Sequence, residues 1–197
     1  MRNTVRWVAA AAATITIAGG AVPASANDPV SRVTGTAEFR LPFAPDNDVR
    51  QFSFDVKADP FTRPLPGRPQ GLPMDATGTV RVSHHVATSN VTVTFEAAVD
   101  CLITSPGYAA MTAVVTRADT PVADWVGKRV GFSVQDGGRG GHGDRAGYSW
   151  SMSADQEEDG TWVQARVGTC LAPAPFGPVT RGDFRVRHVE LREDPQP

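Results

Sequence analysis

The sequence predicts an all-β protein, either a single antiparallel β-sandwich or a closed β-barrel of about eight or nine strands, behind an N-terminal signal peptide. Apolar and polar residues alternate with a period of two along most of the chain, as half-buried strands require. Clusters of turn residues separate the alternating segments, which is typical of sandwiches and barrels. After residue 26, no segment of normal helix length repeats its apolar residues with a helical period.

Residues 1–26 match the three-part pattern of a secretory signal peptide. Arg2 and Arg6 provide a positive start, residues 7–17 (WVAAAAATITI) are apolar, and residues 24–26 (ASA) form a small-residue cleavage site. The apolar stretch is too short for a membrane anchor, which needs roughly 20 residues. We therefore expect one secreted, extracellular β domain over residues 27–197, with no membrane association after cleavage.

Nine segments of this domain have the alternation of a strand. Residues 91–101 are the clearest, because their apolar side chains from Val91 to Cys101 share one face. Ser89-Asn90 predicts a hairpin with the preceding segment, and Asp159-Gly160 predicts another. A single helical turn is expected at residues 122–126. The nine segments are residues 33–43, 49–56, 77–86, 91–101, 109–116, 129–135, 147–153, 161–167 and 184–191.

Two loops depart from this pattern. Residues 58–76 contain five prolines, and they cannot form a central strand because proline lacks the backbone N–H that a strand ladder needs. A loop of this length is either functional or mobile, and we expect a mobile crossover. Residues 136–145 contain five glycines, which predict a flexible connection between strands.

The glycine-rich loop holds two weak candidates for a metal site, Asp136 and Asp144. Their carboxylates could share a cation such as calcium, which takes oxygen ligands. The segment nevertheless lacks the ordered acids of an EF-hand and the GK[ST] ending of a phosphate loop. No HExxH motif and no Cys/His zinc spacing occurs, so no cofactor is predicted. The acidic run at residues 155–159 is expected to be a solvated turn.

Three histidines are the candidates for acid–base chemistry. His84 and His85 are adjacent on one expected strand, so they point to opposite faces and cannot easily bind one metal together. We expect His84 to be half-buried on the apolar face and His85 to be solvated. His188 could approach either of them only across a sheet. No GxSxG elbow marks a nucleophilic serine.

The two cysteines, Cys101 and Cys170, are expected to form a disulfide, because two cysteines without any others in an exported protein usually pair. Closing a loop of this length would stabilise the fold by about 4 kcal/mol in the chain-entropy account. The alternative is a reactive thiol, which needs a neighbourhood that lowers its pKa. No basic residue lies close to either cysteine in the sequence to provide one.

Five pieces of the sequence resemble one group of proteins. They are residues 99–102 (VDCL), 126–136 (VGKRVGFSVQD), 143–150 (GDRAGYSW), Cys170 with 174–176 (APF), and 182–188 (GDFRVRH). In these pieces the chain resembles small secreted β-domain proteins of actinobacteria, a group of uncharacterised function. The resemblance implies an exported β domain with its two cysteines paired. It carries over no functional residue.

The leading interpretation is a non-catalytic secreted protein that binds a ligand, a surface polymer or another protein, with Tyr108, Trp125 and Trp162 as candidate stacking residues. The alternative is an extracellular hydrolase or isomerase with its site in a barrel mouth, where His84, His188 or the two loop aspartates would have to converge. A third is an inhibitor or interaction protein that presents residues 58–76 to a partner. The net charge of −2 becomes −4 once Arg2 and Arg6 are removed, which disfavours nucleic acid. We expect a monomer.

Overall fold

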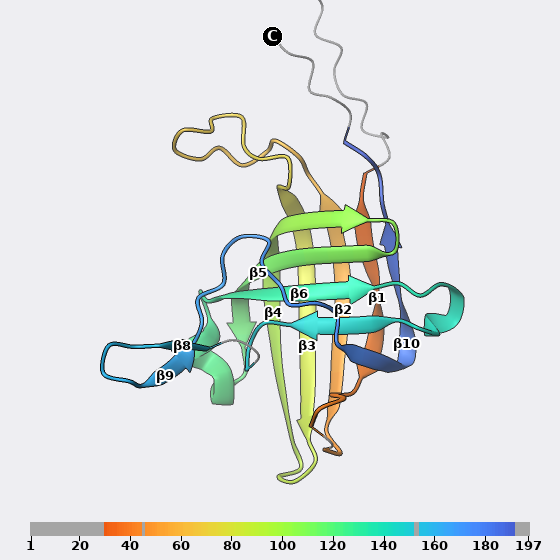
Figure 1. Cartoon of the computed structure of the whole chain (residues 1–197), viewed down its shortest axis with the longest axis vertical. Coiled ribbons are helices and arrows are strands. Elements are labelled where there is room, and N and C mark those ends of the chain that lie inside the picture. Colours follow the sequence, from red (N-terminus) through yellow and green to blue (C-terminus); the bar gives the residue numbers. More distant parts are fainter. Residues whose placement is uncertain (1–29, 45, 152–153, 192–197) are drawn as a thin grey trace, which may run out of the picture.

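The structure is a computed structural model that describes residues 30–44, 46–151 and 154–191. The predicted signal peptide lies outside the described residues. Eight antiparallel strands close into a barrel in the order β1-β10-β7-β6-β5-β4-β3-β2 (Figure 1), which confirms the all-β class and selects the barrel over the sandwich. The barrel strands are β1 (Arg32–Phe39), β2 (Val49–Ala58), β3 (Ala76–Val86), β4 (Val91–Ser105), β5 (Tyr108–Ala118), β6 (Arg129–Gln135), β7 (Arg145–Tyr148) and β10 (Gly177–Arg187).

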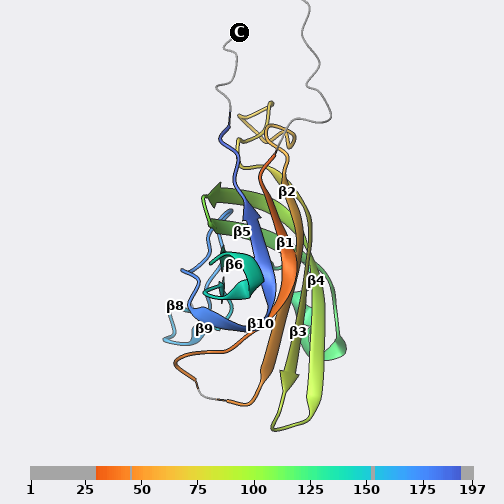
Figure 2. The same ribbon diagram turned by 90° about the vertical axis from the view of Figure 1, so that its right-hand side faces the viewer.

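Two short strands, β8 (Ala154–Gln156) and β9 (Trp162–Gln164), form a separate hairpin outside the barrel (Figures 1 and 2). The predicted strand at residues 161–167 therefore exists in shortened form but does not join the barrel. Its hairpin turn is the expected one, because Gly160 has a φ of 86°, which suits glycine. The expected helical turn is the 3-10 segment η1 (Thr120–Trp125), and η2 (Arg139–Gly141) is a second, shorter one.

Because apolar and polar residues alternate along the strands, every second side chain points into the barrel. Along β2, Phe52, Phe54 and Val56 are buried, and the residues between them face outward. The interior of an eight-stranded barrel is narrow enough for the inward side chains to fill it. The centre is packed with the aromatic rings of Phe39, Phe52, Phe54, Phe132 and Phe184, all of them buried.

Cys101 and Cys170 form the expected disulfide, with their Cα atoms 5.3 Å apart. Cys101 is buried on β4, and Cys170 belongs to the segment that returns from β9 to β10. The backbone N–H of Cys170 also donates to Thr112 Oγ1 on β5 at 3.0 Å. The returning segment passes so close to β6 that a Cβ at Gly131 would collide with the Leu171 carbonyl oxygen, a contact that only glycine avoids.

The proline-rich loop has internal anchors that its composition does not reveal. One oxygen of Asp75 accepts the backbone N–H groups of Thr62, Arg63 and Leu72 at 3.2, 2.9 and 2.9 Å. The Arg63 side chain donates to the carbonyl oxygens of Ala76 and Val99. These bonds tie the loop to the barrel, although we expected a mobile crossover. Within the described residues, no helix is both long and apolar enough to span a bilayer.

Candidate functional site

A cavity of about 320 Å³ opens at the mouth of the barrel where β2 begins and β3 ends. Antiparallel pairing places Phe39, Arg50, His84 and Val93 in one row across β1, β2, β3 and β4, because each is the register partner of the next. The end of β7 and the segment η1 complete the wall. Six aromatic residues line this cavity, namely Phe39, Phe52, Phe95, Trp125, Tyr148 and Trp150.

The aromatic rings are fixed by packing against one another. Tyr148 and Trp150 stack with ring centroids 4.3 Å apart, and Trp150 meets the edge of Trp125 at 5.9 Å. Trp125 is held over the mouth by η1 and also packs on Phe95 at 5.6 Å. Tilted and edge-on ring pairs of this kind are favourable beyond the area they bury. The wall of the cavity is therefore flat-faced, apolar and ordered.

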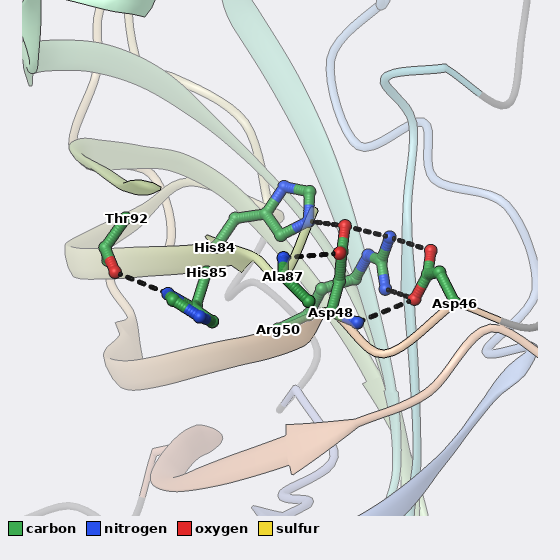
Figure 3. Close-up of polar contacts among 7 residues, drawn as sticks. All are labelled: Asp46, Asp48, Arg50, His84, His85, Ala87 and Thr92. Atoms are coloured by element: carbon green, nitrogen blue, oxygen red, sulfur yellow. Dashed lines mark hydrogen bonds and ion pairs between the residues drawn. The ribbon is translucent and has the colours of Figure 1, made fainter. Parts of the chain in front are cut away.

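Arg50 and His84, which also line the cavity, form a polar cluster with Asp46 and Asp48 (Figure 3). Arg50 faces into the barrel and donates to both oxygens of Asp46 at 2.9 and 2.7 Å. The Asp48 carboxylate accepts from His84 Nε2 at 2.7 Å, from Arg50 at 3.3 Å and from the Ala87 N–H at 2.9 Å. A charged side chain this deep is stable only when it is paired in this way, because its desolvation is costly.

The pairing keeps both carboxyl groups ionised. The Arg50 guanidinium lowers the pKa of Asp46 below its ordinary value of 3.8. Burial alone would raise the pKa of Asp48, but the Ala87 N–H and the His84 imidazole outweigh it and the net direction is down. Burial raises the pKa of Tyr148 above 10.0, with Arg50 opposing, so its hydroxyl stays protonated.

No family model, curated protein or solved structure matches the chain.

His84 and His85 point to opposite sides of β3, as expected (Figure 3). His84 lines the cavity, with its side chain 36% exposed. His85 Nδ1 lies 3.0 Å from Thr92 Oγ1 on the outer face of the neighbouring strand. Of the two histidines, only His84 is therefore placed to meet a ligand in the barrel mouth.

His188 lies away from this cavity, at the opposite mouth. It lines a more open groove of about 490 Å³, together with Ser31, Thr104 and Glu190. Its Nδ1 is 2.8 Å from Thr104 Oγ1, and its Nε2 is 2.9 Å from Glu190 Oε1. His84 and His188 therefore do not converge in one pocket. The hydrolase or isomerase interpretation required His84, His188 or the two loop aspartates to converge.

Asp136 and Asp144 are used to close the barrel. Asp144 accepts the N–H groups of Gly137 at 2.7 Å and Phe184 at 2.8 Å, and Asp136 accepts those of Gly138 and Val186, both at 2.9 Å. Since β7 pairs with β10 only through Gly177 and Pro178, the loop carboxylates take the place of the missing strand carbonyls. Each of the four carboxylate oxygens thus already has a backbone donor.

The remaining candidates lie on the surface. Trp162 is 67% exposed on the outer hairpin, and Tyr108 is exposed at the start of β5. Asp159 accepts the N–H of Thr161 within its own turn. Among the residues that the structure describes, no three or more His, Cys, Asp and Glu side chains are grouped so as to hold a metal ion.

Arg50, Asp46 and Asp48 are not among the site residues predicted from the sequence. One signal could have found Arg50, because it has the same parity as Phe52 and Phe54 and so belongs to the inward face of its strand. An arginine on an apolar face predicts a buried partner. Asp46 and Asp48 are the nearest acids in the sequence.

Proposed function

We propose that this chain is an exported, non-catalytic β-barrel that binds a small, flat, apolar molecule in the cavity between Trp125 and Arg50. The observation that carries the proposal is the lining, with six aromatic side chains and few polar groups around one opening. Ligand sites are typically concave and apolar, with a small number of polar groups that orient the bound molecule. Eight-stranded barrels are just wide enough to hold one small ligand.

The size of the cavity limits the ligand. A volume of about 320 Å³ is at the lower end of the range for ligand pockets, roughly 300 to 1,000 Å³. A dry protein cavity of about 150 Å³ accepts benzene. The proposal therefore specifies a molecule of about two fused rings, because a bulkier ligand would have to displace Trp125 or Trp150.

Export is supported by two features. The N-terminal residues have the composition of a signal peptide, and Cys101 and Cys170 form a disulfide, which persists in oxidising compartments. We include residence outside the cell in the proposal, with the ligand taken from the medium or the cell surface. A secreted binder of this kind needs no partner protein.

Catalysis at the same mouth is a second candidate, favoured by the His84–Asp48 pair. A histidine whose second nitrogen is held by a carboxylate has the arrangement of a general base and its orienting group. Hydrolysis of 2-naphthyl acetate distinguishes the candidates. The binding proposal predicts no acceleration over buffer, whereas catalysis predicts a rate that is lost in His84→Leu and kept in His85→Leu.

Thermal unfolding with 2-methoxynaphthalene tests the binding proposal. At ten times the dissociation constant, a ligand that binds only the folded state stabilises it by about 1.4 kcal/mol and raises the melting temperature by about 3 to 6 °C. Val93→Trp should remove the shift by filling the cavity that Val93 lines. Val91→Trp, at the exposed start of the same strand, is the control and should keep it. No shift in the wild-type protein would contradict the proposal.

A further inference from the structure

We infer that His84 Nδ1 selects a ligand with an aromatic hydroxyl group, so that the natural ligand belongs to the class of small neutral phenols. This inference rests on the proposed binding function of the mouth cavity and adds the chemical group that the cavity recognises. It depends on which nitrogen of His84 carries the proton, on the charge around it and on the other polar groups of the wall.

The hydrogen-bond partners of Asp48 determine the tautomer of His84. An ionised carboxylate only accepts hydrogen bonds, so the His84 Nε2 atom 2.7 Å from Asp48 must be the one that carries a hydrogen. In the neutral imidazole the other nitrogen, Nδ1, then has a free lone pair. Among the described residues none is hydrogen-bonded to Nδ1, and the side chain is 36% exposed where it lines the cavity. Nδ1 is therefore an acceptor open to a ligand.

The ring is held in this orientation from behind. Asp48 is fixed by the Ala87 N–H and by Arg50, and Arg50 is fixed in turn by its two bonds to Asp46. A recognition group whose partner is itself hydrogen-bonded loses little conformational freedom when a ligand binds. The cluster thus resembles the outer-shell support that orients histidines in metal and catalytic sites, but here it orients a lone pair.

Charge favours a neutral ligand over an anion. Asp46, Asp48 and Arg50 together contribute two negative charges and one positive charge, a net charge of −1, and Arg50 is the member of the three that lines the cavity. The N–H groups that Arg50 directs at the two carboxylates are already used. A carboxylate on the ligand would add a third negative charge to a cluster that has one cation, whereas a phenol offers a strong donor without charge.

The other polar side chains of the wall do not make this selection. Ser151 has a hydroxyl group that rotates to donate or accept, and the Tyr148 hydroxyl can do either. They tolerate an ether oxygen as well as a hydroxyl. In the tautomer that Asp48 imposes, His84 Nδ1 only accepts hydrogen bonds, so it favours a ligand that donates one.

Three probes with the same two rings test the inference by isothermal titration calorimetry at pH 8. They are 2-naphthol, 2-methoxynaphthalene and 2-naphthoate. We expect 2-naphthol to bind roughly tenfold more tightly than the methyl ether, the value of one good hydrogen bond, and 2-naphthoate to bind most weakly. In His84→Leu the two neutral probes should bind equally, while the control His85→Leu should keep the preference.

The outcomes separate the two proposals. Equal binding of 2-naphthol and its methyl ether by the wild-type protein would overturn the inference and leave the binding function standing. Tight binding of 2-naphthoate would overturn it as well. If neither neutral probe binds, both proposals fail. A preference for 2-naphthol that survives in His84→Leu would assign recognition to another group and so overturn the role of His84. The comparison of the probes on the wild-type protein does not depend on whether any variant folds.

Discussion

The Asp48 carboxylate lies 2.7 Å from the His84 imidazole, although the two residues are 36 positions apart in the chain. The register of β2 and β3 produces this contact, because Arg50, two residues after Asp48, is the direct partner of His84. Asp48 directly precedes β2, and its backbone N–H donates to Asp46 Oδ1 at 3.1 Å. One carboxylate thereby orients the histidine of the cavity and compensates the buried arginine beside it.

Replacing Asp48 with asparagine should destabilise the protein. The amide cannot accept from His84, Arg50 and Ala87 at once, and it places N–H groups where donors already point. We expect the free energy of unfolding in urea to fall by about 1 to 3 kcal/mol. Asp55→Asn, at an exposed acid on the outer face of β2, is the matched control and should change it by less than about 0.5 kcal/mol. Equal effects of both substitutions would show that the Asp48 contacts contribute nothing.

Asp144→Asn should weaken the seam between β7 and β10. The Asp144 side chain is almost completely buried, and its second oxygen holds the Phe184 N–H. An amide can satisfy only one of the two backbone donors, so we expect a loss of about 2 to 3 kcal/mol in the free energy of unfolding. Hydrogen exchange at the Phe184 amide should accelerate more than at Val80 in the barrel core. Asp155→Asn on the outer hairpin should leave both measurements unchanged.

Removal of the disulfide by a Cys101→Ala and Cys170→Ala double substitution should cost about 2 to 5 kcal/mol. For a domain of this length the melting temperature should fall by roughly 2 to 4 °C for each kcal/mol. The loss comes mainly from the unfolded chain, because the bond closes a loop between residues 69 positions apart. The change appears in thermal unfolding followed by circular dichroism. A melting temperature equal to that of the wild type would contradict a stabilising disulfide.

Acid should loosen the proline-rich loop through Asp75. Burial would raise the pKa of Asp75, but the N–H groups of Leu72, Arg63 and Thr62 together lower it below 3.8. A lowered pKa means that the carboxylate stabilises the fold above about pH 4 and that this contribution is lost as the pH falls further. Asp75→Asn should therefore destabilise the protein at pH 7 by about 1 to 3 kcal/mol.

The pH dependence distinguishes a charged from a merely structural role for Asp75. The difference in free energy of unfolding between the wild type and Asp75→Asn should narrow when urea titrations are repeated at progressively lower pH below about 4. A difference that stays constant over that range would show that the ionised carboxylate is not what anchors the loop.

The strands could be predicted from the sequence because a half-buried strand must alternate. Phe52, Phe54 and Val56 alone place β2 correctly, and Ser89-Asn90 marks the turn that joins β3 to β4. The closure of the barrel could not be predicted, since it depends on β1 pairing with β10 across most of the chain. β10 itself begins at Gly177, seven residues before the predicted Phe184, because Gly177, Pro178 and Gly182 hide its alternation.

The site was only partly predictable for a related reason. His84 could be placed on the inner face from its parity, but its partner Asp48 is brought to it by the register of two strands. Asp136 and Asp144 were candidate cation ligands because carboxylates in a glycine-rich loop can either bind a cation or accept backbone N–H groups. Their backbone partners, Phe184 and Val186, are 40 and 50 positions away, a distance over which local sequence carries no information.

The most direct test of ligand binding in the mouth cavity is the indole N–H spectrum of ¹⁵N-labelled protein titrated with 2-methoxynaphthalene. Trp125 and Trp150 line the cavity, and the exposed Trp162 on β9 serves as an internal control. We expect the Trp125 and Trp150 resonances to shift with a single dissociation constant while the Trp162 resonance does not move. A shift confined to Trp162, or no shift at the solubility limit of the probe, would contradict it.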